Sequence, residues 1–389
     1  MEYTMNMIDA VYDMSQLDQF NDDYSELLCF LNSSNFRSFG EGLEAIIQKK
    51  MPQDCDMTAR EYLEKCCQET GVSVASPSTI RNWFNGSPRP KKGDKSREDM
   101  FTLAFALKLT AEETQELFHK VYLDRAYDKR DYRELIYYYC LKKGNPYAHA
   151  QKLIAMVSFS DEPQDRTMYT SVIAKETSSL TDDTEMLAYI YSHPHNFSLN
   201  NIAAMEAYAH QWEKARIIVS MELGFISKPT TKFEARSRGD WDTKRLKDFA
   251  DKDINSAAFD YEVITGQRIS VKGAKGTKPL SFKNAELPKE IKTNFPTSPA
   301  LDKNPSNEQL RKMIILLFSY SFWYQVQARG MEDVFDMYID QLDELLSDIG
   351  YPPMYFGNPY DWLFLACTSM AQPLDAFRSI LDEVLNTEF

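Results

Sequence analysis

Apolar residues in this chain recur at spacings of three and four, and few stretches alternate polar with apolar residues. The spacing is seen in Leu103 and Leu107, and again in Leu342, Leu345 and Leu346. Such spacings place side chains on one face of an α-helix, whereas a half-buried strand requires alternation. The fourteen glycines and seventeen prolines lie mainly between the periodic segments, where they mark turns between helices. The sequence therefore predicts an all-α protein.

Charge is distributed unevenly along the 389 residues. Residues 1–36 hold seven acids and no base, and residues 331–389 hold twelve acids and one base. The two ends together carry a net charge of −18, whereas the whole chain carries −14. Residues 37–330 therefore carry about +4. A nucleic-acid partner, if the chain has one, is therefore expected to contact the middle of the sequence rather than its ends.

The cysteines and the apolar runs indicate where such a chain works. Six cysteines show no CxxC pair or metal-ligand spacing, and no charged-then-apolar leader precedes them, which predicts free thiols in the cytoplasm. The longest uncharged apolar run covers the sixteen residues 313–328, whereas a membrane span needs roughly 20. We expect a buried helix there and no membrane partner.

The segment from Ser76 to Asn85 is predicted to form a short helix with two different faces. Ser76 is a suitable N-cap, Pro77 fits the first turn, and Asn85 with Gly86 ends the helix. One face is apolar and must be buried; it consists of Ile80, Trp83 and Phe84. The other face contains no acid, and its side chains can hydrogen-bond to base edges or phosphates; it consists of Ser78, Arg81, Asn82 and Asn85.

A run of bases follows this helix. Residues 78–97 carry six bases and one acid, although residues 37–122 balance thirteen bases with thirteen acids. DNA affinity depends on neutralised phosphates, so DNA binding requires that these bases gather on one side of the domain. The bases expected at phosphates are Arg89, Lys91, Lys92, Lys95 and Arg97.

The stretch "GVS…STIRNWFNG…RP" (71–90), followed by "MFTLAFALKLTAEETQELF" (100–118), resembles the helix-turn-helix domain of the Xre/phage-repressor family. The resemblance covers residues 36–122. It implies a five-helix domain whose third helix enters the major groove of double-stranded DNA, usually from a homodimer. The helices are expected at 36–50, 58–70, 76–85, 96–109 and 111–122. By position, the resemblance implies base or near-base contacts for Ser78, Thr79, Arg81 and Asn82, and core places for Ile80, Trp83, Leu103, Ala106 and Leu107.

Two further stretches resemble a little-described type of helix-turn-helix protein of Gram-positive mobile elements. They are the tyrosine-rich "VYLDRAYDKRDYRELIYYYCLKKG" (121–144) and "GYPPMYFGNPYDWLFLAC" (350–367). This resemblance implies an organisation but no established activity. The expected parts are an acidic N-terminal segment (1–35), the helix-turn-helix domain (36–122), a helical region (123–227), a basic irregular excursion (228–306) and an acidic C-terminal helical domain (307–389).

These observations favour a sequence-specific DNA-binding transcriptional regulator with a helical sensing or dimerisation region. The alternative is a protein-interaction module of a mobile element that binds a protein partner through its helix-turn-helix-shaped domain and acidic C-terminal region. The densest aromatic patch is either core or the lining of a groove for a peptide or helix. Its candidate partner-binding residues are Tyr351, Tyr355, Tyr360 and Trp362.

The remaining patterns predict little chemistry. In the excursion, residues 261–271 are expected to form a short strand or hairpin, and its bases and aromatics either hold nucleic acid or pack back on the helices. The five histidines have no catalytic or metal-binding motif around them. We therefore expect a protein that is not an enzyme and binds no metal or cofactor.

Overall fold

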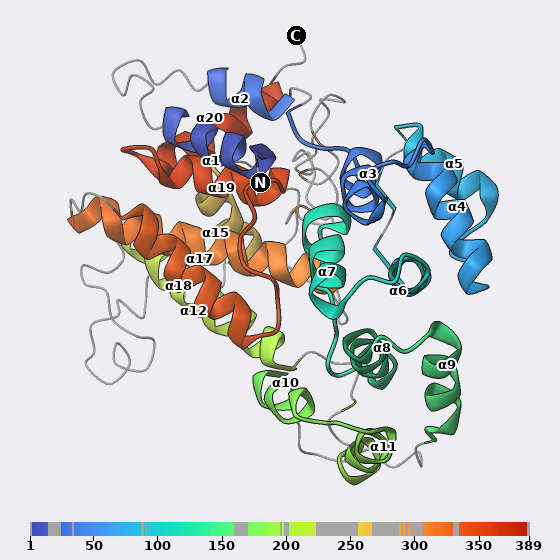
Figure 1. The fold of residues 1–389 in the computed structure, drawn as a ribbon. Helices are drawn as coiled ribbons and strands as arrows, with labels where there is room; N and C mark the ends of the chain where they lie inside the picture. Colours follow the sequence, from blue (N-terminus) through green and yellow to red (C-terminus); the bar gives the residue numbers. More distant parts are fainter. Residues whose placement is uncertain are drawn as a thin grey trace, which may run out of the picture. The chain divides into compact units, whose positions relative to one another are not determined.

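The regular structure of this protein is helical. A computed structural model describes residues 2–14, 25–32, 35–86, 89–90, 92–158, 170–194, 197, 202–222, 256–266, 288, 291, 295, 306–329 and 334–386. Within these ranges there are α-helices and one π-helical turn, and no strand (Figure 1). The prediction of an all-α protein is confirmed. Most of the 228–306 excursion lies outside the described residues, as does Lys91.

The chain forms two compact units, which we call unit 1 and unit 2. Unit 1 comprises residues 1–36, 204–343 and 356–389, and unit 2 comprises residues 37–203 and 344–355. Each unit is therefore built from segments that are far apart in the sequence. Because the second boundary falls inside a helix, the last turn of α18 (Phe335–Asp348) belongs to unit 2.

Unit 1 is organised around a fully buried helix, α19. The described helices of this unit are α1 (Glu2–Met14), α2 (Ser25–Asn32), α12 (Ile202–Glu222), α15 (Ser256–Thr265), α17 (Asn307–Arg329), α18, α19 (Pro359–Thr368) and α20 (Pro373–Asn386). Every residue of α19 is buried. The indole of Trp362 donates a 3.2 Å hydrogen bond to the carbonyl of Met7 in α1, and its ring stacks on Phe30 of α2 at 4.4 Å. The acidic N-terminal segment thus packs on the C-terminal helices.

The long apolar run of the sequence lies in α17 and is buried, as expected. Residues 313–317 of this helix are at most 1% exposed. At its start, the Arg311 guanidinium forms a bidentate ion pair with the fully buried Asp361 carboxylate, at 2.6 and 2.8 Å. None of the described helices combines the length and the apolar character that crossing a membrane would require.

The expectation of a strand at residues 261–271 is wrong for its described part. Residues 261–265 form the C-terminal half of α15. Tyr261 and Ile264, three residues apart, are both fully buried, whereas Val263 is only half-buried. A helix buries residues at that spacing, whereas a strand would place Tyr261 and Val263 on the same face.

Unit 2 contains the region of the predicted DNA-binding helix. Its described helical elements are α3 (Phe39–Lys50), α4 (Ala59–Thr70), α5 (Pro77–Phe84), α6 (Asp94–Ala106), α7 (Ala111–Glu116), η1 (Leu117–Tyr122), α8 (Tyr132–Lys143), α9 (Tyr147–Met156), α10 (Thr170–Ser178) and α11 (Asp183–Ser192). Reciprocal capping boxes begin three of these helices, at Ser38 with Glu41, Thr58 with Glu61 and Thr110 with Glu113. The five side chains assigned to the core by resemblance are all buried: Ile80, Trp83, Leu103, Ala106 and Leu107.

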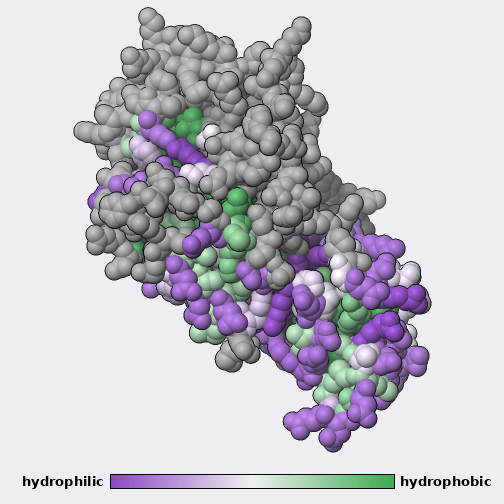
Figure 2. Space-filling view, turned by 90° about the horizontal axis from the view of Figure 1, so that it is seen from above, coloured by the Kyte–Doolittle hydropathy of each residue, from purple (hydrophilic) through white to green (hydrophobic). Residues whose placement is uncertain are grey.

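One face of the described chain is mostly polar. On the face drawn in Figure 2, hydrophilic side chains cover most of the described surface, and hydrophobic atoms show in patches between them. All six cysteines are free thiols, and Cys140 and Cys367 are buried. Burial raises the pKa of the Cys140 thiol to about 12, so this side chain is a neutral core residue.

Candidate nucleic-acid interface

Helix α5 is defined locally by its own sequence. The Ser76 hydroxyl accepts a 3.1 Å hydrogen bond from the Thr79 amide and caps the helix, and Pro77 occupies the first turn. The chain leaves the helix at Asn85 and turns at Gly86, whose φ of +73° is a left-handed conformation that glycine adopts without strain. The structure thus has the helix expected between Ser76 and Asn85.

One face of α5 is anchored in the core of unit 2. Ile80 and Trp83 are 7% and 4% exposed, and the Trp83 ring meets Phe39 of α3 edge-on at 5.5 Å. Gly40 lets the two helices approach closely, because a Cβ at this position would lie 2.4 Å from the Trp83 carbonyl oxygen. Helix α5 is therefore held in one position and orientation against α3.

The opposite face of α5 is exposed and carries no acid. Ser78, Arg81, Asn82 and Asn85 are all exposed, in agreement with their spacing. Thr79 is half-buried, and its hydroxyl lies 2.8 Å from the Ser76 hydroxyl, which makes it part of the cap. Among the described residues, none forms a hydrogen bond or ion pair with the side chains of Arg81 and Asn82. Their donors and acceptors are available to a ligand.

The bases after α5 are not equivalent. Lys95 is exposed on the first turn of α6, and Lys92 is half-buried. The Arg89 guanidinium donates hydrogen bonds to the carbonyls of Val121 and Arg37, at 2.7 and 3.1 Å. Arg89 therefore ties the segment after α5 to η1 and to the start of α3.

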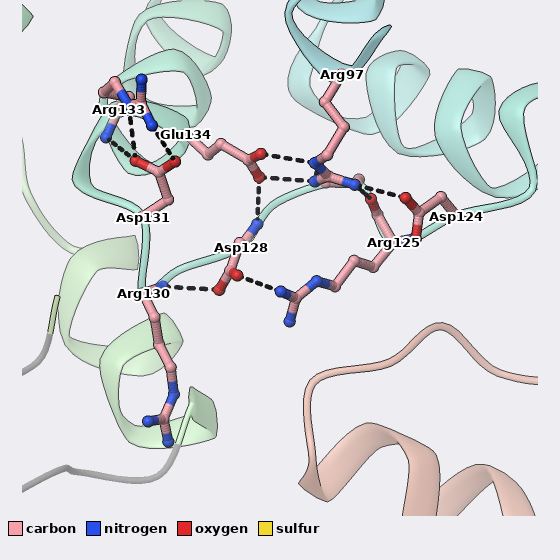
Figure 3. A network of polar contacts seen from close by, with 9 residues as sticks. Arg97, Asp124, Arg125, Asp128, Arg130, Asp131, Arg133 and Glu134 are labelled. Carbon is pink, nitrogen blue, oxygen red and sulfur yellow. Dashed lines mark hydrogen bonds and ion pairs between the residues drawn. The ribbon is translucent and has the colours of Figure 1, made fainter. Parts of the chain in front are cut away.

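Arg97 is buried and has a structural role. Its side chain is 14% exposed, and all five of its N–H groups donate hydrogen bonds. The acceptors are the carboxylates of Glu134 (2.7 and 2.8 Å) and Asp124 (2.8 Å) and the carbonyls of Arg125 (3.1 Å) and Ala126 (3.2 Å) (Figure 3). Burial alone would lower the pKa of the guanidinium, but the Glu134 and Asp124 carboxylates outweigh this and raise it. Arg97 cannot reach a phosphate, which corrects the expectation for this residue.

The sequence contained a signal for the burial of Arg97. Helix α6 begins at Asp94, two residues earlier than expected, with Gly93 in the N-cap position. Arg97 then lies on the helical face of Met100, Phe101 and Ala104, at spacings of three, four and seven. All three of these residues are fully buried, so Arg97 points into the unit.

Several bases of residues 37–122 form salt bridges within the described part of the chain, whereas Arg81 and Lys95 do not. Five other bases of residues 37–122 are paired with glutamates of α4 and α7. The pairs are Lys49–Glu116 (3.0 Å), Lys50–Glu113 (2.7 Å), Arg60–Glu64 (3.6 Å), Lys65–Glu69 (3.8 Å) and Lys120–Glu116 (2.7 Å). Arg81 and Lys95 form no salt bridge with any described residue. These pairs neutralise four of the thirteen acids in residues 37–122, namely Glu64, Glu69, Glu113 and Glu116.

The aromatic patch proposed as a partner site is divided between the two units and buried in both. Tyr351 and Tyr355 belong to unit 2, whereas Tyr360 and Trp362 belong to unit 1. The four side chains are at most 7% exposed, and the Tyr360 hydroxyl donates a 2.7 Å hydrogen bond to the Lys312 carbonyl. Of the two alternatives, core and groove lining, the structure favours core for Tyr355, Tyr360 and Trp362, whereas Tyr351 lines a pocket of unit 2.

The structure offers no metal centre in its described residues, where no group of three or more His, Cys, Asp or Glu side chains is placed to hold an ion. In comparisons with known proteins, no family model, no curated protein and no solved structure matches the chain. The function must therefore be inferred from the residues themselves.

Proposed function

We propose that the protein is a sequence-specific DNA-binding transcriptional regulator that acts in the cytoplasm. In this proposal, α4 and α5 form a helix-turn-helix, as the resemblance to the Xre/phage-repressor family suggests, and α5 enters the major groove. The observation that carries the proposal is the exposed, acid-free face of α5 with Arg81 and Asn82, opposite a face fixed in the core.

The size and chemistry of α5 suit a major groove. Its eight residues span about 12 Å at 1.5 Å per residue, and the major groove is about 12 Å wide. Arg81 can donate two hydrogen bonds to a guanine, and the amides of Asn82 and Asn85 can pair with adenine. Lys92 and Lys95 follow on the adjoining segment and are proposed to contact phosphates, which would fix the register of α5 on the duplex.

A homodimer is part of the proposal, because helix-turn-helix proteins of the Xre/phage-repressor family usually bind DNA as dimers that read two half-sites. Half-sites one helical turn apart, about 34 Å, are expected if two copies present α5 to the same side of the duplex. The acidic ends of the chain add negative charge, which would reduce non-specific binding to DNA.

The proposal is tested by selecting binding sites from double-stranded oligonucleotides with a random core, using the full chain. Affinity for the selected site is then measured by fluorescence anisotropy for wild type, Arg81→Ala and Asn82→Ala. Each variant should bind about 10-fold to 100-fold more weakly, the worth of one bidentate base contact. Lys152→Ala, which removes an exposed charge from α9 in the same unit, is the matched control and should bind like wild type.

Two results would contradict the proposal. One is that no sequence is enriched over the random pool, which is the outcome expected of the alternative, a protein-interaction module. The other is that Arg81→Ala and Asn82→Ala bind the selected site as tightly as the Lys152→Ala control.

A further inference from the structure

A pocket of about 610 Å³ lies within unit 2, away from the face of α5. It is walled by α7 and η1, by the loop that follows η1, and by the segment from Ser347 to Pro353. Pockets of roughly 300–1,000 Å³ are the usual size for small organic ligands. Its size therefore suits an organic molecule rather than a single ion.

The inner wall of this pocket is cationic. Arg125 is only 5% exposed, and its guanidinium forms an ion pair with the Asp128 carboxylate. Its Nε is buried and has no hydrogen-bond partner among the described residues.

Lys129 is the second cation of the wall. Its ammonium lies 3.1 Å from the centre of the Tyr138 ring and 5.2 Å from that of Tyr127. Burial, with a smaller contribution from Lys142, lowers the pKa of Lys129 to about 7, and Glu134 opposes the shift. No carboxylate in the described part of the chain forms a salt bridge with this ammonium. A bound anion would supply the missing charge.

The acids that line the pocket do not cancel these cations. Glu116 is already bound by Lys120 at 2.7 Å and by Lys49 at 3.0 Å. Glu112 is exposed and therefore hydrated. Asp128 is already paired with Arg125, so the pocket cation without a paired carboxylate is Lys129.

Flat and apolar surfaces complete the walls. The Arg125 guanidinium lies 5.8 Å from the centre of the Tyr351 ring, and Tyr127, Pro352 and Pro353 line the same space. Such surfaces favour a planar ring, which can stack on aromatic and guanidinium faces.

The backbone around the pocket is held in uncommon conformations. Residues 117–122 form a π-helical turn, which brings His119 and Lys120 to the pocket, and the His119 ring contacts the Pro353 carbonyl at 3.1 Å. Leu123 follows with φ +58°, which is rare for a residue with a branched side chain. π-turns and strained residues occur often at ligand sites, and here the Arg97 network holds the loop that carries Arg125 (Figure 3).

We propose that this pocket binds a small organic anion, a planar ring that carries a carboxylate or a phosphate. The anionic group lies between Arg125 and Lys129, and accepts hydrogen bonds from the Arg125 guanidinium and the Lys129 ammonium. The ring lies against Tyr351, Tyr127 and the two prolines. The pocket is separate from the proposed DNA-binding face, and nothing in its chemistry requires DNA.

The test uses three ring compounds that differ in one group: benzoate, phenyl phosphate and benzyl alcohol. Binding to the full chain is measured without DNA, by saturation-transfer NMR and by titration followed in protein spectra. Benzoate or phenyl phosphate, or both, should bind at least 10-fold more tightly than the neutral alcohol. If only benzoate binds, the pocket is a carboxylate site. If only phenyl phosphate binds, it is a phosphate site. Either outcome supports the proposal.

Variants assign the binding to the pocket. Lys129→Met and Arg125→Met should each weaken binding of the anionic probe at least 5-fold. Lys152→Met, which replaces an exposed lysine of α9, should leave this binding unchanged. Because Arg125→Met also leaves Asp128 unpaired and could impair folding, Lys129→Met is the decisive variant. Equal binding of all three probes to wild type, or equal binding of the anionic probe to wild type and Lys129→Met, would overturn the proposal.

Discussion

Unit 2 contains two groups of basic residues that look alike in the sequence and differ in the structure. On α5 and the start of α6, Arg81 and Lys95 are exposed and form no salt bridge with a described residue. Arg97 and Arg125 are buried and form ion pairs with Glu134, Asp124 and Asp128. The number of bases in a stretch therefore says little about DNA binding, because burial decides which of them can meet a phosphate.

The strongest contrast is expected between Arg97→Met and Arg81→Met in chemical unfolding. Arg97→Met leaves the Glu134 and Asp124 carboxylates buried without their cation, and breaking such a pair costs about 3–5 kcal/mol in the free energy of unfolding. Arg81→Met, on the exposed face, should change it by less than about 0.5 kcal/mol. Similar urea midpoints for the two variants would show that the Arg97 network does not stabilise the unit.

The anchoring of α5 is tested by Gly40→Ala. The added Cβ would lie 2.4 Å from the Trp83 carbonyl oxygen, so α5 must move away from α3. We expect a loss of about 1–3 kcal/mol in stability, together with weaker DNA binding. The control is Gly93→Ala, whose Cβ meets no atom within 4 Å and whose cost should be about 0.5–1 kcal/mol, the N-cap preference for glycine over alanine. Equal thermal midpoints for both variants would contradict the close contact.

The sequence predicted much of this arrangement. Helical spacing and caps located α5, and the assignment of Ile80 and Trp83 to the core is confirmed. The start of α6 was placed two residues late, and the burial of Arg97 was missed although Arg97 lies inside the predicted helix and shares a face with Met100 and Phe101. The pocket could not be predicted, because Arg125 and Tyr351 come from segments separated by most of the chain. Only long-range packing brings them together.

The charge of Lys129 should also respond to pH. Because the pKa of Lys129 is lowered to about 7, its ammonium loses its charge as the pH rises through this value, while benzoate stays ionised. Benzoate affinity should therefore fall about tenfold, or ~1.4 kcal/mol, from about pH 6 to about pH 8.5. The groups around the ammonium are Tyr127, Tyr138, Glu134 and Lys142, with Glu112 in the same pocket wall.

Lys129→Met separates this lysine from His119, which lines the same pocket. The variant should bind benzoate weakly and without dependence on pH over this range. A pH dependence as steep as that of wild type would assign the titration to another group.

The smallest effect is expected at Lys95, which is proposed to contact a phosphate. Lys95→Ala should weaken binding to all DNA sequences alike, by about threefold. It should also reduce the steepness of log affinity against log salt concentration by about 0.9. Lys152→Ala should leave the slope unchanged. If Lys95→Ala altered the preferred sequence instead, this lysine would contact a base.

The central claim is that the exposed face of α5 reads bases, and the most direct test is to repeat the site selection with Arg81→Ala and with Lys95→Ala. If Arg81 contacts a guanine, Arg81→Ala should lose the preference at one base pair and keep it at the others, and Lys95→Ala should select the wild-type sequence. If Arg81→Ala selects the wild-type sequence with every preference intact, α5 does not read DNA through this face.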